Sequence, residues 1–122
     1  MERPFFSIVT PVFNGEIFLE ETIKSVLDQD FKNFEYIIID GDSKDNTKNI
    51  IDKYKHNLAY YKSEKDNGMY DALSKGFKLC SGKYFLWINS DDFLNDRKVL
   101  SNLNKYLLKF PNIDWLAGKP SY

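Results

Sequence analysis

The stretch that decides the fold is Phe34-Glu35-Tyr36-Ile37-Ile38-Ile39-Asp40-Gly41-Asp42-Ser43. Its first six residues are dense in isoleucine and aromatic side chains, which is typical of a buried β-strand. Asp, Gly and Ser then follow without a gap, and these residues favour a loop. The sequence therefore predicts a strand over residues 34–39 that ends in a polar loop at Asp40.

The same alternation continues on both sides of this stretch. Further strands are expected over residues 5–12, 58–61 and 83–88, with a candidate fifth at 113–117. Apolar residues at helical spacing predict helices that run to about Gln29, with Asn14 as the cap, and then over residues 47–54, 69–80 and 100–110. This order predicts an α/β domain, a mostly parallel, Rossmann-like sheet with right-handed crossovers and helices on both faces.

Composition sets limits on the class of protein. The chain has 122 residues, which suits a single domain, and 43% of them are apolar, enough for a core. The net charge is -1 and the lysines are scattered singly, so we expect no nucleic-acid partner. Cys80 is the only cysteine, and no apolar run is long enough for a transmembrane helix. We expect a cytoplasmic protein, with a peripheral position at the inner face of the membrane as an option.

Polar and acidic residues gather where the predicted strands end. These segments are 10–14, 40–43, 64–68 and 89–92. In parallel sheets ligands bind outside the carboxyl ends of the strands. Clustered carboxylates repel one another, and a bound cation removes that conflict. Oxygen ligands alone suit Mg²⁺ or Mn²⁺.

A simpler interpretation is that Asp and Asn cap helices and form turns after strands. For any one of the four segments the two interpretations are about equally good. The simpler one is weaker for Asp91-Asp92, because an acidic pair directly after a buried strand places two like charges together with little gain.

The segments also match a known family in order and spacing. They are residues 7–14, 35–47, 66–72 and 89–92, and the chain resembles the N-terminal half of family 2 inverting glycosyltransferases of the GT-A fold. The resemblance extends from Phe5 over nearly the whole chain. It implies one domain over residues 1–122 that is the N-terminal part of a longer catalytic domain. It also implies that a sugar is transferred from a nucleoside-diphosphate donor to a saccharide or lipid-linked saccharide acceptor, and we expect the donor to be UDP-linked.

The resemblance also implies roles for individual residues. Thr10, Pro11, Val12, Phe13 and Asn14 match the segment that cradles the base, with Phe13 as the stacking ring. Asp40 matches a carboxylate that accepts a hydrogen bond from the base. Asp91 matches the residue near the ribose and the metal, and Asp92 matches the direct ligand of Mg²⁺ or Mn²⁺. Asn89 belongs to the same matching segment and is expected among the nucleotide-binding residues.

Two further acidic residues match less specific positions. Asp66 matches a loop residue that faces the nucleotide pocket, and Asp71 is about equally suited to the first turn of a helix and to the site. The sequence of residues 68–72 resembles that of transferases that build bacterial surface polysaccharides. Asp42 stands where the family usually has Gly, or a second acidic residue, and this departure leaves the role of Asp42 open.

The family's catalytic domain is about twice this length, and inverting transfer needs a general base, which we expect beyond residue 122. A non-catalytic nucleotide-binding module is therefore one alternative for this chain. A phosphorylation receiver domain is a weaker one, because no acidic pair follows the first strand. A dinucleotide-binding oxidoreductase is weaker still, because no Gly-x-Gly-x-x-Gly follows that strand.

Overall fold

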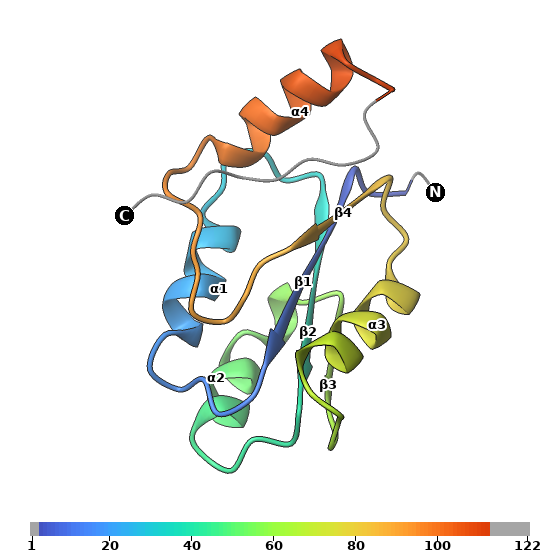
Figure 1. Ribbon diagram of the computed structural model, residues 1–122. Helices are drawn as coiled ribbons and strands as arrows, with labels where there is room; N and C mark the ends of the chain where they lie inside the picture. Colours follow the sequence, from blue (N-terminus) through green and yellow to red (C-terminus); the bar gives the residue numbers. More distant parts are fainter. Residues whose placement is uncertain (1–2, 113–122) are drawn as a thin grey trace.

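The computed structural model describes residues 3–112 and contains one four-stranded parallel sheet in the order β3-β2-β1-β4 (Figure 1). The strands are β1 (Phe6–Val12), β2 (Phe34–Asp40), β3 (Tyr60–Ser63) and β4 (Tyr84–Trp87). The helices are α1 (Leu19–Leu27), α2 (Thr47–Lys53), α3 (Met69–Leu79), α4 (Val99–Lys109) and the short 3₁₀ helix η1 (Lys55–Asn57). The predicted α/β class and parallel sheet are confirmed.

β1 is the central strand, and its register brings the carboxyl ends of the strands together. Phe6 lies opposite Phe34 on β2 and opposite Tyr84 on β4, and Val12 lies opposite Asp40. All seven residues of β1 are buried. The loops after β1 and β2 therefore start side by side at one edge of the sheet.

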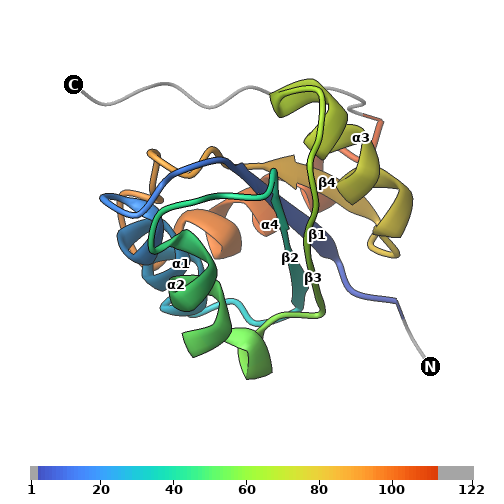
Figure 2. The ribbon, with the colours of Figure 1, turned by 90° about the horizontal axis from the view of Figure 1, so that it is seen from below.

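Helices cover both faces of the sheet, as predicted. Figures 1 and 2 show α3 on one side, with α1, α2 and α4 on the other. Side chains of a strand alternate between faces. Ile8 and Ile38 belong to the larger core with the three helices, whereas Val9 and Ile37 pack against α3 with Ala72 and Leu73.

Two predicted boundaries are wrong. α1 begins at Leu19 and its N-cap position is Phe18, so Asn14 does not cap it. Asn14 instead adopts a left-handed backbone conformation with φ of 50°, five residues before Leu19. β3 spans Tyr60–Ser63 rather than residues 58–61, because Leu58 caps η1 and its N–H donates to the Lys55 carbonyl. The candidate strand at residues 113–117 lies outside the described residues.

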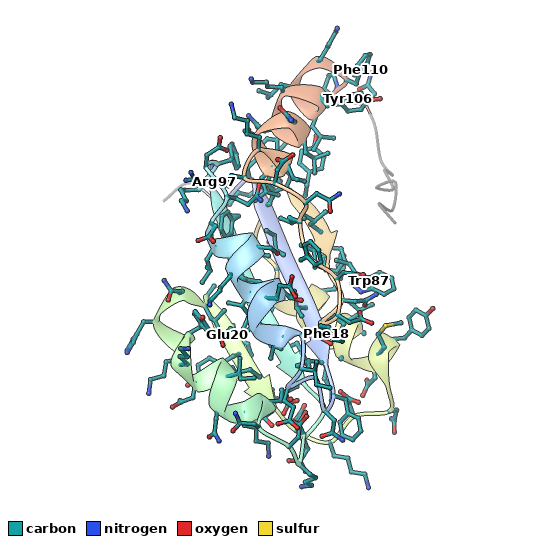
Figure 3. All side chains as sticks on the ribbon, turned by 90° about the vertical axis from the view of Figure 1, so that its left-hand side faces the viewer. Phe18, Glu20, Trp87, Arg97, Tyr106 and Phe110 are labelled. Atoms are coloured by element: carbon teal, nitrogen blue, oxygen red, sulfur yellow. The ribbon has the colours of Figure 1, made fainter. Side chains whose placement is uncertain are left out.

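α1 and α2 are also joined at the surface. Glu20 on α1 accepts hydrogen bonds from Lys53 Nζ at 2.6 Å and from the Tyr54 hydroxyl at 2.5 Å, and Figure 3 shows Glu20 on the side of α1 toward α2. Partial burial, and then Glu20 itself, raise the pKa of Tyr54 to about 12.

Among residues 3–112, no helix has the length and apolar character needed to cross a bilayer.

Gly76 lets α3 approach the sheet closely, and this gives a test of the packing. A Cβ at Gly76 would lie 2.5 Å from Cγ1 of Val9, which is fully buried in the central strand. We expect Gly76→Ala to destabilise the protein by about 1–3 kcal/mol through overpacking, although alanine favours helices. Urea unfolding measures this effect. Ser74→Ala, at an exposed position of the same helix, is the control, and equal stability of the two variants would contradict the packing.

Candidate functional site

A cavity of about 1050 Å³ lies at the carboxyl ends of the strands. A volume of this size can hold a large small-molecule ligand. Its walls come from the loops that follow β1, β2, β3 and β4, together with the start of α3. The lining residues are Pro11, Val12, Phe13, Asn14, Gly15, Ile17, Phe18, Gly41, Asp42, Lys44, Lys65, Asp66, Gly68, Met69, Ala72, Asn89, Ser90 and Asp91.

The loops after β1 and β2 are fastened to each other along their length. The Asn14 backbone N–H donates to Ser43 Oγ at 2.7 Å, and the Lys44 N–H donates to Asn14 Oδ1 at 2.9 Å. Gly15 N–H donates to Thr47 Oγ1 at 2.9 Å. The left-handed conformation of Asn14 is thus held from two sides, and the two loops form one wall of the cavity.

Asp40 lies beneath this wall rather than on it. Its side chain is fully buried and does not line the cavity. Oδ2 accepts the Ser43 N–H at 3.1 Å and the Ser63 hydroxyl at 2.7 Å, and Oδ1 accepts the Ser43 hydroxyl. The carboxylate therefore orients Ser43, whose hydroxyl oxygen in turn holds Asn14. In this arrangement the expected hydrogen bond from a base to Asp40 has no access from the cavity.

Two other predicted residues are also away from the cavity wall. Thr10 is fully buried, and its hydroxyl lies 2.8 Å from the Tyr36 hydroxyl, whose pKa is raised by burial. Asp71 accepts the Asn67 N–H at 3.0 Å and lies 3.4 Å from Lys75 Nζ. The Asn67 N–H lowers the pKa of the Asp71 carboxyl. Asp71 thus closes the first turn of α3, which is the simpler of its two expected roles.

The acidic segment after β4 forms a tight turn against α1. The Asp92 N–H donates to the Asn89 carbonyl at 3.1 Å. The buried Thr22 hydroxyl reaches the Ser90 carbonyl at 2.9 Å and also contacts the Asp92 carbonyl. Two carbonyls of the turn therefore point toward α1, and the segment is fixed relative to the sheet.

More polar groups at the end of α1 hold the rest of the β4–α4 connection. Ser25 Oγ accepts the Leu94 N–H at 3.1 Å. The buried Gln29 donates to the Asp96 carbonyl at 2.5 Å and accepts the Leu100 N–H at 3.0 Å. Arg97, seen near the end of α1 in Figure 3, donates to the Asp28 carbonyl at 3.1 Å. A connection without regular structure is thereby tied to α1 at successive turns.

The residues of this turn fit a hard cation only as a partial site. Asp91 lines the cavity, and Asp92 follows it in the chain, outside the lining. Nowhere in residues 3–112 do three or more His, Cys, Asp or Glu side chains gather closely enough to hold a metal ion. Mg²⁺ is commonly held by one or two carboxylates plus ligand phosphates and water. The donor set therefore suits a cation that arrives with a phosphate ligand, and not a closed structural metal site.

Two lysines on the cavity wall were not predicted. Lys44 lies 3.0 Å from Asp42, which also pairs with Lys48 at 2.6 Å, and Lys48 with Lys44 lowers the pKa of Asp42 to about 2. Lys65 has no ion-pair partner within the described part of the chain. In the sequence these two lysines look like scattered surface charges. Both lysines lie in loops that follow strand ends, and this position in the sequence also pointed to the acidic residues of the same loops, so it could have indicated the lysines as well.

Apolar side chains form the rest of the cavity wall. Phe13 is 62% exposed and Phe18 is 51% exposed, although both are large and apolar. Figure 3 shows Phe18 at the start of α1. Aromatic faces left open beside charged groups can stack on a planar, polar ligand. Seven of the predicted residues therefore share this cavity: Pro11, Val12, Phe13, Asn14, Asp66, Asn89 and Asp91.

The role of Asp40 can be tested by stability. In Asp40→Asn the amide presents a donor to partners that all donate, so we expect a loss of about 1–3 kcal/mol of unfolding free energy. Asp42→Asn, two residues away at the surface, should change stability by about 0.5 kcal/mol or less. Denaturant unfolding compares the two. An Asp40→Asn protein as stable as the Asp42→Asn protein would show that the buried network is not needed.

The anchor of the acidic turn gives a second test. Thr22→Val keeps the shape and removes the hydroxyl, so the Ser90 and Asp92 carbonyls lose the group that they contact on α1. We expect about 0.5–1.5 kcal/mol lower stability and faster hydrogen exchange at the Asp92 amide. Thr22→Ser keeps the hydroxyl and should preserve slow exchange at this amide. Unchanged exchange in the valine variant would mean that Thr22 does not hold the turn.

The sequence is similar to that of known glycosyltransferases. The model of the family "Glycosyl transferase family 2" matches residues 7–115. An uncharacterized glycosyltransferase of Rickettsia typhi is 37% identical over 111 residues, which is 91% of this chain and 34% of the relative. A PGL/p-HBAD biosynthesis glycosyltransferase of Mycobacterium bovis is 30% identical over 121 residues, which is 97% of this chain and 47% of that protein. The chain thus spans half or less of the length of these relatives.

Solved structures share the fold. S. aureus TarS, residues 1–349, has a TM-score of 0.79 at 26% identity, covering 86% of this chain and 32% of that one. TarS is also solved in complex with UDP-GlcNAc. A mannosyltransferase from Pyrobaculum calidifontis, solved with GDP-Man and Mn²⁺, has a TM-score of 0.77 at 23% identity over 88% of this chain and 33% of its own. Together with the sheet order and the match over residues 7–115, these findings show that the chain belongs to glycosyltransferase family 2 and has the GT-A fold.

Proposed function

We propose that this chain forms the donor-binding part of an inverting glycosyltransferase. It would bind a nucleoside-diphosphate sugar together with a divalent cation, and the enzyme would transfer the sugar to an acceptor hydroxyl. The observation that carries this proposal is the cavity of about 1050 Å³, which combines open aromatic faces, two lysines and the Asn89–Asp91 segment at the carboxyl ends of parallel strands.

Each part of the cavity suits a different part of such a donor. Phe13, with Pro11 and Val12 beside it, offers an apolar surface on which a base can stack. Lys44 and Lys65 offer positive charge to a diphosphate. Asn89 and Asp91 offer oxygen atoms to the ribose and to a cation.

The cation would be Mg²⁺ or Mn²⁺, held by Asp91 and Asp92. When bound, it would supply positive charge that stabilises the departing nucleoside diphosphate. The chain's own contribution is to keep the acidic turn rigid through Thr22, so that two carboxylates stay next to the cavity. A rigid donor set binds a cation without having to be ordered first.

The solved relative TarS binds UDP-GlcNAc, which supports a uridine nucleotide as the donor. The likeness of residues 68–72 to surface-polysaccharide transferases supports a saccharide or lipid-linked saccharide acceptor in cell-surface polysaccharide synthesis. In inverting transfer, the acceptor oxygen bonds to the anomeric carbon as the bond to the diphosphate breaks, and a general base takes the hydroxyl proton. We assign no residue between 3 and 112 as that base.

Calorimetric titration with uridine diphosphate tests the proposal without requiring turnover. We expect binding that is stronger with Mn²⁺ or Mg²⁺ than with a chelator. Asp92→Ala should remove most of the metal-dependent gain, about 10–100-fold in affinity, which is the range for loss of a group that supports a metal site.

The matched control is Asp52→Ala, which removes an exposed carboxylate on α2. It should bind like the unmodified protein. Equal affinity with and without metal would overturn the metal part of the proposal. Absence of any nucleoside-diphosphate binding would overturn the donor site itself.

A further inference from the structure

We infer that Asp66 is the carboxylate that accepts the ring N–H of the donor's base, and that it selects uracil over cytosine. This inference rests on the proposed donor site and gives it a base specificity. It moves the base contact from the end of β2, where the sequence suggested Asp40, to the loop between β3 and α3.

Asp40 is out of reach of a base in the cavity. The side chain is fully buried, and both oxygens accept hydrogen bonds from Ser43 or Ser63. The next residue, Gly41, lines the cavity but carries no side chain. The end of β2 therefore presents backbone, and not a carboxylate, to the cavity.

The carboxylate of Asp66 occupies the space beside Gly41. A Cβ at Gly41 would lie 2.8 Å from Asp66 Oδ2 and 3.0 Å from Oδ1. The missing side chain at residue 41 is thus what lets Asp66 come to this position from another loop. Asp66 itself lines the cavity, so its carboxylate faces a ligand there.

One oxygen of Asp66 is held and the other is open. The Gly68 N–H donates to Oδ1 at 3.0 Å, which fixes the orientation of the carboxylate. Oδ2 accepts no hydrogen bond from any of residues 3–112. An oriented carboxylate with one open oxygen is an acceptor that is already in place for an N–H donor.

The other two carboxylates on the cavity wall are less suited to this contact. Asp42 is paired through both oxygens, with Lys44 at 3.0 Å and Lys48 at 2.6 Å. Asp91 comes from the turn after β4, whereas Asp66 adjoins the end of β2, and β1 lies between β2 and β4 in the sheet. Asp66 is therefore the acceptor that a base can use while Asp91 remains next to the diphosphate.

The Asp66 carboxylate can distinguish uracil from cytosine because the two bases differ at ring atom N3. N3 of uracil carries a hydrogen and donates, whereas N3 of cytosine has a lone pair that a carboxylate repels. A buried polar group left without its partner lowers the affinity for the wrong ligand. We expect UDP to bind about 10–100-fold more tightly than CDP, the range for one hydrogen bond to a charged group.

The experiment measures the ratio of UDP to CDP affinity by calorimetry at one fixed Mn²⁺ concentration. In Asp66→Asn the amide can either donate or accept, so the ratio should fall toward one. Gly41→Ala tests the same contact with Asp66 unchanged, because its Cβ takes the space of the carboxylate, and it should lower the ratio as well. Circular dichroism and thermal melting confirm that each variant is folded.

Glu64→Gln is the matched control. Glu64 lies in the same loop and pairs with Lys62 at 3.3 Å and Lys75 at 3.1 Å, outside the cavity lining. Its removal changes the charge of the loop equally and should leave the ratio unchanged.

The possible outcomes separate the two proposals. A high ratio that falls in Asp66→Asn and Gly41→Ala but not in Glu64→Gln supports the inference. A ratio near one in the unmodified protein, or a ratio that folded Asp66→Asn retains, overturns the inference and leaves the metal-dependent donor site standing. Failure of the unmodified protein to bind either nucleotide overturns the donor site, and the inference falls with it.

Discussion

Asp40 ties the two central strands to the loops that form the cavity. It is the last residue of β2 and lies opposite Val12, the last residue of β1. Its carboxylate gathers Ser43 and Ser63, and the Ser43 hydroxyl carries the connection on to the Asn14 backbone. One buried acidic group thus organises segments after β1, β2 and β3. Buried polar groups that are fully hydrogen-bonded can specify such an arrangement, because any alternative leaves them without partners.

A second set of polar groups, buried or half-buried, fixes the connection that follows β4. Thr22 and Ser25 on α1, and Gln29 just after its end, each hydrogen-bond to the backbone of this connection. A helix that supplies apolar residues to the core therefore also positions the acidic turn. This arrangement explains why an irregular segment can carry a precisely placed Asp91, since its carbonyls and N–H groups have fixed partners.

The sequence predicts the sheet and the helices, because hydrophobic periodicity reports burial directly, and it predicts the end of the sheet where the cavity lies. It does not predict which way a polar residue at a strand end points. Thr10 and Asp40 turn into the core, while Asn14 and Asp66 reach the cavity. This outcome depends on partners such as Tyr36 and Ser63, which are distant in the chain. Family resemblance aligned Asp40 by position, and position alone does not reveal that its oxygens are taken.

The sequence did not predict the two lysines of the cavity for a related physical reason. Lys44 and Lys65 are single charges in the sequence, and only the folded loops bring them to one cavity together with Asp42, Asp66 and Asp91. The resulting balance of charge suits a ligand that has both a base with an N–H donor and a diphosphate. The cavity therefore combines open aromatic faces and lysines with an incomplete cation site, which a ligand phosphate would complete.

Paramagnetic NMR tests the central claim, that the turn after β4 holds a cation beside a bound nucleotide, most directly. Mn²⁺ added at low ratio in the presence of UDP broadens the amide signals of nearby residues. The account predicts broadening centred on residues 89–92, dependent on UDP, with signals of Glu64 in the β3–α3 loop and Asp71 in the first turn of α3 much less affected. Broadening centred on Glu64 and Asp71, or broadening that is the same without UDP, would contradict it.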